Sequence, residues 1–454
     1  MTAGDHGLRF ALVVSHDGPQ ASLAAAVLEH LRDVTALRQT SLEDADLLLH
    51  LSDQPLSSPF PKYGVWTFHC ESRGRFLNEV FIRQATSSGS RILERRILPS
   101  SLSHTDTLSL LADAPARICR LLLAGLPLPS CQESPPNLPP QRPWHSLSSQ
   151  IRNTLLTEIW HVGLVQAPIH RFLDPTFQPK VKWLPNARPH HFFADPFLSQ
   201  LPGDSLRILV EEYDYAEDPT GRIAELTWHD NRFQLPPQRI LASSAHMSYP
   251  FLLSDQGNFY CIPESWQQNR IQLHRLDPQT RQWDSGITII DNIPAVDSTV
   301  IHHAGRWWLF CTEKGPGVDS RLLLWHATKL EGPWSPHIAN PVKVDVRSAR
   351  PGGTPFVTDG VLYRPAQDCS ESYGCRLAMN RVTSLSPSAY SEETVRVLSP
   401  WPDWPYPHGL HTLSAAGNWT ILDAKRMTFL PALAKRRLAY KLHRLRRLLA
   451  SSKD

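Results

Sequence analysis

Carboxylate side chains recur at matching places in the second half of this 454-residue sequence. Asp195 and Asp297 stand at the start of short apolar segments, and Glu264 stands at the end of a similar one. Transfer or hydrolysis of a glycosyl group passes through an oxocarbenium-like state, which needs a carboxylate as base or stabiliser and often an acid for the leaving group. We therefore take Asp195, Asp297 and Glu264 as candidate catalytic residues, provided that the fold brings them together.

A pattern that occurs five times after Trp183 supplies the elements to position them. In each copy a polar or small residue precedes an apolar strand, a tight turn follows, and an aromatic-rich strand ends in a carboxylate. The copies span residues 194–212, 248–264, 297–313, 353–368 and 411–423. Their anchor residues recur every 48 to 58 residues, which is typical of propeller blades with two further strands each. We expect an all-β five-bladed propeller over residues 150–424, closed by a strand within 158–170.

The first strand of each blade in a propeller lines the central channel, so polar residues at equivalent places should converge. This geometry adds candidate substrate-binding residues, which could equally be turn, cap or surface ion-pair residues: Tyr249, Glu313, Arg350, Arg364, Asp368, His408 and His411. Arginine could bind a phosphate or carboxylate in bidentate fashion, and histidine could bind sugar hydroxyls. The acidic run 211–218 has no clean pattern of hard-metal ligands, so we expect no divalent metal.

The N-terminal region has a different character. Residues 8–15, 44–51 and 63–69 are typical of buried strands, and residues 19–33 and 105–123 of helices. This alternation predicts an α/β domain over residues 1–128. Residues 129–149 are rich in proline and polar residues, which predicts a stiff linker between domains.

The C-terminal residues 425–454, which we call the basic tail, carry ten Lys or Arg and one acid, although the whole chain has a net charge of only +3. Within the tail, residues 428–450 combine a leucine-rich face with basic faces, which predicts an amphipathic helix on an anionic membrane surface. A helix packed on the protein and a nucleic-acid contact are the alternatives, and we do not expect nucleic acid as a partner.

Composition sets further bounds. Forty prolines against 22 glycines favour a turn-rich, largely β protein. No apolar run approaches the ~18–20 residues that span a bilayer, and the first residues lack the pattern of a signal peptide. Seven scattered cysteines without a CxxC pair fit free thiols in the cytoplasm.

Several motifs together carry a resemblance to a known family. FFADPFL (192–198), HMSYPFL (246–252), VDSTV (296–300), GRWWLF (305–310) and RPAQDCSESYG (364–374) resemble the propeller domain of glucosamine inositolphosphorylceramide transferase-like proteins, which is similar to furanosidase propellers. The N-terminal domain looks like a degenerate, Rossmann-like formyltransferase domain. GVWTFHC (64–70) keeps His69 but lacks that family's asparagine, so we do not expect formyl transfer.

The resemblance implies roles for the carboxylates. Asp195, before Pro196, stands where the furanosidase-like propellers place their base, and Asp297 resembles the carboxylate that tunes the acid's pKa. Glu264 and Glu313 are candidate acids, of which we take Glu264. The expected function is a glycosyltransferase of cell-surface polysaccharide or glycolipid assembly, with a nucleotide-sugar donor and a glycan or lipid-linked acceptor, at the inner face of the membrane. A furanosidase-type hydrolase and a non-catalytic carbohydrate-binding propeller remain alternatives.

Overall fold

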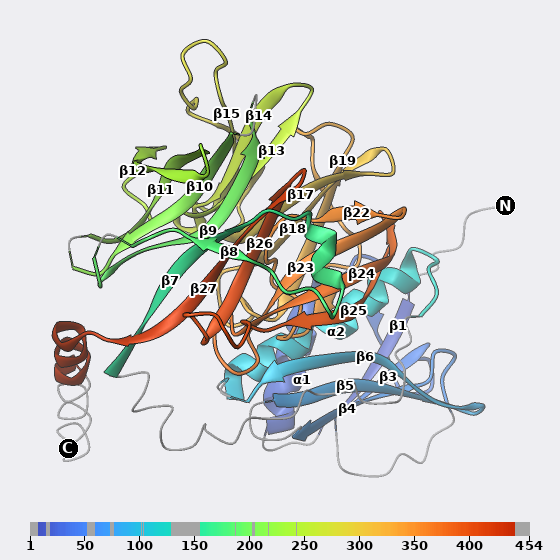
Figure 1. Cartoon of the computed structure of the whole chain (residues 1–454). Helices are drawn as coiled ribbons and strands as arrows, with labels where there is room; N and C mark the ends of the chain where they lie inside the picture. Colours follow the sequence, from blue (N-terminus) through green and yellow to red (C-terminus); the bar gives the residue numbers. More distant parts are fainter. Residues whose placement is uncertain are drawn as a thin grey trace.

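The computed structural model describes most of the chain (Figure 1). The described residues are 8–14, 19–51, 60–72, 77–100, 102, 104–128, 155–186, 188–201, 205–216, 218–241 and 243–440. The predicted linker 129–149 and residues 441–454 of the basic tail lie outside this set.

The N-terminal region forms a six-stranded mixed sheet in the order β2-β1-β3-β4-β5-β6. Its elements are β1 (Leu8–Val14), α1 (Pro19–Arg32), β2 (Leu37–Gln39), β3 (Leu47–Leu51), β4 (Val65–Ser72), β5 (Leu77–Thr86), β6 (Gly89–Pro99) and α2 (His104–Leu123). Apolar side chains of β1 and β3 pack with Val27 of α1 and Ile118 of α2 in one core. Strands β1 to β4 pair in parallel, as the βαβ-like alternation predicts, whereas β5 and β6 add an antiparallel hairpin that the sequence did not indicate. The α/β class is confirmed, and likeness to a formyltransferase stays a prediction.

Five sheets after Leu155 form the predicted propeller, and the largely β character is confirmed. Blade 1 has β9 (His191–Gln200), β10 (Leu206–Asp214), β11 (Asp218–His229) and β12 (Arg232–Ile240), and blade 2 has β13 (Ser248–Asp255), β14 (Asn258–Glu264), β15 (Arg270–Arg275) and β16 (Ile287–Asp291). Blade 3 has β17 (Ala295–His303), β18 (Arg306–Glu313), β19 (Arg321–Ala327), β20 (Ser335–Pro336) and the short β21 (Lys343–Val344). Blade 4 has β22 (Phe356–Thr358), β23 (Val361–Asp368), β24 (Arg376–Ser386) and β25 (Ala389–Leu398).

Blade 5 joins the two ends of the propeller sequence. Its inner strands β26 (Gly409–Ala416) and β27 (Trp419–Phe429) come from the C-terminal side, and its outer strands β7 (Leu156–Val165) and β8 (Val181–Trp183) precede blade 1. Strand β7 pairs with β27 along its whole length, as Figure 1 shows. The predicted closing strand is thus confirmed over residues 156–165, while Ile169–Leu173 form a short 3₁₀ helix.

The innermost strand of four blades carries a β-bulge near its start. The pairing register shifts around Asp195, Tyr249 and Asp297, and around His411 and Thr412 in blade 5. Asp195, Tyr249 and Asp297 have backbone φ angles of 48°, 42° and 53°, a left-handed conformation that non-glycine residues rarely adopt. Bulges re-aim side chains, and strained backbone concentrates at functional sites. These bulges turn side chains of separate blades toward the channel.

The N-terminal domain packs against loops of blades 3 and 4. Val346, between β21 and β22, donates its backbone N–H to the Ile97 carbonyl of β6 at 3.0 Å. Leu77 and Ile97 pack with Val346 and Cys369, and Tyr373 packs against this small cluster.

After β27 the chain forms a helix over residues 431–440, drawn in red in Figure 1, which we call the rim helix. None of the helices in the described part of the chain is long and apolar enough to cross a membrane.

Candidate functional site

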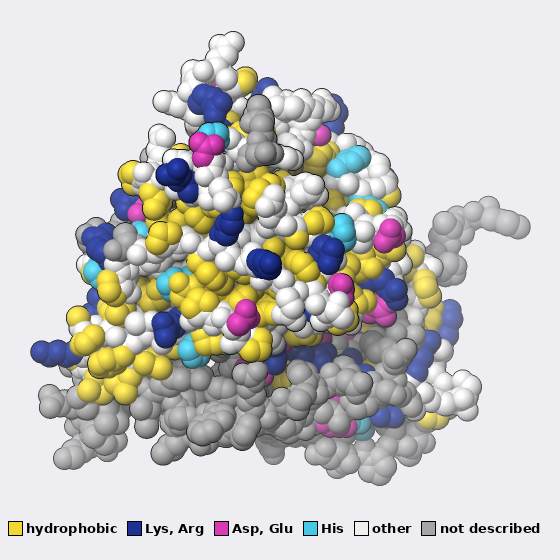
Figure 2. Space-filling model, in the orientation of Figure 1, with side chains coloured by type: hydrophobic (Ala, Val, Ile, Leu, Met, Phe, Trp, Pro, Cys, Tyr) yellow, Lys and Arg dark blue, Asp and Glu magenta, His cyan; other side chains and the backbone are white. Residues whose placement is uncertain are grey.

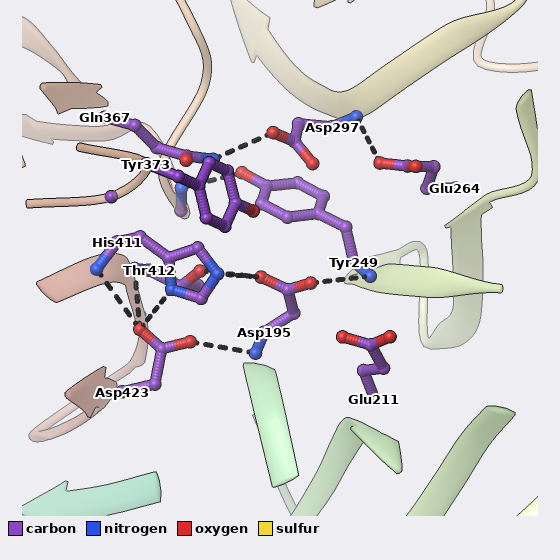
Figure 3. Close-up of polar contacts among 12 residues, drawn as sticks. Asp195, Glu211, Tyr249, Glu264, Asp297, Gln367, Tyr373, His411, Thr412 and Asp423 are labelled. Atoms are coloured by element: carbon purple, nitrogen blue, oxygen red, sulfur yellow. Dashed lines mark hydrogen bonds and ion pairs between the residues drawn. The ribbon is translucent and has the colours of Figure 1, made fainter. Parts of the chain in front are cut away.

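Five carboxylates from four blades gather near the starts of the inner strands (Figure 3), and we call this buried cluster the funnel. They are Asp195 and Glu211 of blade 1, Glu264 of blade 2, Asp297 of blade 3 and Asp423 of blade 5, and each is at most 7% exposed. The structure brings together the three residues proposed as catalytic, although they are up to 102 positions apart in the sequence.

His411 links two of these carboxylates. Its Nδ1 lies 2.7 Å from Asp423 Oδ1, and its Nε2 lies 3.1 Å from Asp195 Oδ1. Its ring stacks on Trp160 at a centroid distance of 3.8 Å. Burial by itself lowers the pKa of His411, but the charges of Asp423 and Asp195 outweigh it and raise the pKa to about 10. His411 is therefore an imidazolium at neutral pH, held between two acceptors.

Asp195 has its acceptor capacity filled by fixed donors. The Thr412 hydroxyl donates to Oδ1 at 3.0 Å, and the Tyr249 backbone N–H donates to Oδ2 at 3.2 Å. Burial pushes the pKa of Asp195 up, but the charge of His411 and these hydrogen bonds leave it below the ordinary value. Asp195 is thus an ionised carboxylate inside a closed site.

Asp423 organises the backbone beneath this pair. It accepts the backbone N–H of Asp195 at 2.9 Å and that of Thr412 at 3.0 Å. One side chain thereby fixes the bulge of the first blade against the bulge of the last.

Asp297 and Arg350 form a second ion pair opposite. Arg350 Nε lies 2.6 Å from Asp297 Oδ2, and its other end reaches Asp319 at 2.8 Å. Gln367 also donates to Asp297, at 2.8 Å, and Tyr373 lies under the guanidinium at 4.9 Å. Burial, resisted by Arg350 and reinforced by the charge of Asp195, raises the pKa of Asp297.

Glu211 and Glu264 are the two carboxyl groups of the cluster whose pKa the site raises well above the usual range. Burial raises the pKa of Glu211 well above its usual range, and the charges of Asp195 and Glu264 add to this effect. Burial also raises the pKa of Glu264 strongly, and the charge of Asp297 adds to it. Glu264 accepts the backbone N–H of Asp297 at 3.3 Å. A carboxyl group with a raised pKa beside a carboxylate with a lowered pKa is the arrangement of a general acid and its partner.

Tyr249, a predicted substrate-binding residue, is instead buried within the cluster. Its phenol lies 3.0 Å from the Thr299 hydroxyl and accepts the Gly353 backbone N–H at 2.7 Å. It is fully buried, so its polar contacts are made within the protein.

The structure does not bring four other predicted residues into the cluster. Arg364 pairs with Glu392 at 2.6 Å in a buried structural contact, and Asp368 pairs with Arg376 at 2.9 Å. His408 accepts the Met427 backbone N–H, outside the cluster. Glu313 pairs with the residue two positions before Asp297, the anchor of its blade. Glu264 pairs with the residue one position before Tyr249, the anchor of its own blade. Side chains alternate along a strand, so this offset sends Glu313 to the other face.

The same offset explains which residues the sequence reasoning missed. Glu211 pairs with the residue one before Asp195, which is the register position of Glu264 in the next blade. We had placed the strand end at Glu212, which instead pairs with His191 at 3.0 Å. Room for the Glu211 side chain depends on Gly221, because a Cβ there would lie 2.4 Å from Glu211 Oε1.

Asp195, His411 and Asp423 also form the one group among the described residues that could offer three ligand atoms to a metal, all within 4.8 Å of one another. Metal-bound histidine is neutral, whereas both ring nitrogens of His411 face carboxylates that favour its protonated form. The group therefore fits a hydrogen-bonded triad better than a metal site, and the expected lack of a divalent metal stays a prediction.

Fold and site together define a five-bladed propeller with a buried acid and carboxylate cluster. Residues 182–400, just under half of the chain, match the family model described as glucosamine inositolphosphorylceramide transferase 1, N-terminal. The predicted resemblance is confirmed for this region.

Curated relatives agree with this assignment. A protein named glucosamine inositolphosphorylceramide transferase 1 from Arabidopsis thaliana is 34% identical over 216 residues, covering 46% of this chain and 28% of its own length. One of the same name from Oryza sativa subsp. japonica is 31% identical over 254 residues, covering 53% of this chain and 34% of its own. The chain thus spans about a third of the length of these relatives.

Solved structures similar to this chain include glycosidases. An exo-β-1,3-galactanase from Clostridium thermocellum has a TM-score of 0.38 and 11% identity, covering 49% of this chain and 57% of its own. An exo-1,5-α-L-arabinanase from a bovine ruminal metagenomic library has a TM-score of 0.38 and 14% identity, covering 51% of this chain and 92% of its own.

Proposed function

We propose that this chain is a glycosyltransferase that acts in the assembly of a cell-surface glycolipid or polysaccharide. Two things support the proposal: the relatives that match its propeller are named as transferases, and the funnel holds a carboxylate with a lowered pKa beside carboxyl groups with raised pKa values. The donor would be a nucleotide sugar, and the acceptor a glycan or a lipid-linked sugar. The work would take place in the cytoplasm, at the inner face of the membrane.

The single observation that carries this proposal is the contrast between Asp195 and Glu264 within one buried site. In the reaction we propose, Glu264 donates its proton to the leaving group or acts through a bound water, while Asp195 stabilises the positive charge that develops on the sugar or accepts the acceptor's proton. Arg350 holds Asp297 in place and keeps a positive charge at the edge of the site.

The experiment is a donor screen. Wild type and Asp195→Asn are incubated with a panel of nucleotide sugars and a membrane-lipid extract, and released nucleotide is measured. We expect release that needs the extract and falls by at least about 100-fold in the variant, the scale on which positioned acid–base groups act. Arg364→Lys serves as the control, because Arg364 lies in a structural ion pair outside the cluster.

Glycoside hydrolysis is the second candidate, because the same acid and carboxylate pair can use water as the acceptor. Hydrolysis of aryl furanosides without nucleotide release would favour it. Silence in both assays, with retained carbohydrate binding, would favour a non-catalytic binding propeller.

For the N-terminal domain we propose a scaffold role on a formyltransferase-like fold. His69 contacts the Thr67 hydroxyl at 2.9 Å and stacks on Phe81, so its side chain is engaged within the sheet. Through Ile97 the domain supports the loop of blade 4 that presents Tyr373 to the funnel.

A further inference from the structure

The rim helix begins at the edge of the funnel. Strand β27 carries Asp423 into the cluster and ends at Phe429. The next residue, Leu430, packs against the apolar cluster that includes Trp160 and Phe192, and Tyr373 packs against the same cluster. The Tyr373 ring in turn contacts His411 at a centroid distance of 5.4 Å. An aromatic cluster therefore lies between the start of the helix and the polar site.

One face of the rim helix is fixed to the propeller. Leu433 and Ala434 are buried, and Arg437 donates to the Leu156 carbonyl at 2.8 Å. This attachment sets the direction in which the remaining face points.

The remaining face combines apolar and basic side chains that are exposed. On the helix Leu438 is 48% and Tyr440 69% exposed, and Lys435 and Arg436 are exposed with them; Phe429, the last residue of β27, is 56% exposed. In Figure 2 basic and apolar side chains meet at the lower left, where Figure 1 draws this helix. Exposed large apolar residues among basic ones are the signature of a segment that lies in a membrane interface.

Charge selects the kind of membrane. The basic tail has ten Lys or Arg and one acid, whereas the rest of the chain has 36 Lys or Arg and 42 Asp or Glu. An anionic surface attracts the basic tail but not the rest of the chain. Electrostatic attraction would therefore orient the molecule on the membrane as well as bind it.

We propose that the exposed face of residues 429–440 binds the interface of an anionic bilayer and so holds the end of the propeller that carries the carboxylate cluster toward that bilayer. The occupant of this surface is the membrane itself. A consequence that rests on the proposed function is that the acceptor keeps its lipid in the bilayer while its sugar reaches Asp195.

The test of charge uses vesicle sedimentation with full-length protein. Vesicles contain phosphatidylglycerol and phosphatidylcholine, or phosphatidylcholine alone. The variant K435E/R436E is compared with R232E/R281E, which makes the same charge change at two exposed residues, the first residue of β12 and a residue of the loop between β15 and β16. Both lie at the opposite ends of the strands from the carboxylate cluster. We expect binding to the anionic vesicles only, weakened at least about tenfold by K435E/R436E and little by the control.

The test of insertion uses an apolar pair with matched exposure. Leu438→Asp is compared with Val357→Asp, since Leu438 is 48% exposed and Val357, on β22, is 49% exposed. We expect a several-fold loss of vesicle binding for Leu438→Asp and no loss for Val357→Asp. Circular dichroism spectra that match wild type establish that each variant is folded.

Three results would overturn the inference: no binding to anionic vesicles, equal losses in a variant and its control, or preferential binding of the tail to DNA with the same dependence on Lys435 and Arg436. Vesicle binding is measured without sugar transfer. A protein that binds vesicles but transfers no sugar therefore refutes only the proposed function, and one that transfers sugar without binding vesicles refutes only this inference.

Discussion

The electrostatics of the funnel can be tested by replacing Asp423 with asparagine. Asp423 Oδ1 lies 2.7 Å from His411 Nδ1, and its charge is the largest influence that raises the pKa of His411 against burial. Asparagine keeps the shape and an acceptor oxygen but removes the charge. We expect the pKa of His411 to fall well below about 10, because burial is then opposed only by the charge and the hydrogen bond of Asp195.

The size and sign of the effect follow from proton linkage. The pKa of His411 is about 10 in the folded protein and ~6.5 in the unfolded chain, so its contribution to the free energy of unfolding is complete below pH 6.5 and is lost as the pH rises through 10. At about 1.4 kcal/mol per pKa unit, the contribution is roughly 4 kcal/mol at pH 7 and roughly 1 kcal/mol at pH 9. The variant loses most of this contribution at both pH values.

The assay is urea unfolding at pH 7, 8 and 9, followed by tryptophan fluorescence. The free energy difference between wild type and Asp423→Asn should shrink by roughly 2 to 3 kcal/mol from pH 7 to pH 9. The control is Asp345→Asn, whose partner Arg347, 2.6 Å away, does not titrate in this range, so its difference should stay constant. A difference for Asp423→Asn that is the same at pH 7 and pH 9 would show that His411 is not held as an imidazolium.

Three further predictions concern the acid, the metal and the backbone. Glu264→Gln should abolish transfer, and Glu211→Gln should reduce it less. The wild-type rate should fall as alkaline pH deprotonates Glu264, which a pH–rate profile checks. Equal losses of activity in the two variants would contradict the assignment of the acid to Glu264. EDTA, or added calcium or magnesium, should leave transfer unchanged, and restoration of activity by a divalent ion after EDTA would contradict the triad assignment. Gly353→Ala should lower the free energy of unfolding in urea by at least about 2 kcal/mol, because the added Cβ would lie 1.9 Å from the Leu413 carbonyl oxygen. Gly360→Ala, where nothing lies within 4 Å of the added Cβ, should lower it by about 1 kcal/mol. Similar losses in the two variants would contradict the close packing of blades 4 and 5.

Much of the propeller could be predicted because its information is local and repeated. A strand and turn pattern recurring every 48 to 58 residues predicts blades, and each strand buries its own apolar residues whatever its neighbours are. The closing strand β7 could be predicted only as an apolar segment outside the five repeats, because its partner β27 lies more than 250 residues away in the sequence. The hairpin of β5 and β6 was not predicted, because charged residues such as Arg96 and Glu94 are not expected in buried strands. In the fold these two residues form a buried ion pair.

The candidate site residues also differ in how far a repeated local pattern could predict their positions. Asp195, Asp297 and Glu264 stand at repeated positions, and the structure brings them together as predicted, whereas Arg364 and Asp368 lie outside the cluster because a small change in register reverses the face of a strand. The sequence by itself determined the number of blades, the anchors at their inner strands and the excess of positive charge in the tail. Only the tertiary structure decided which carboxylates meet, which of them are ionised and where the rim helix begins. The physical reason is that pKa values and register depend on atoms brought within a few ångströms by folding, and those atoms come from blades far apart in the chain.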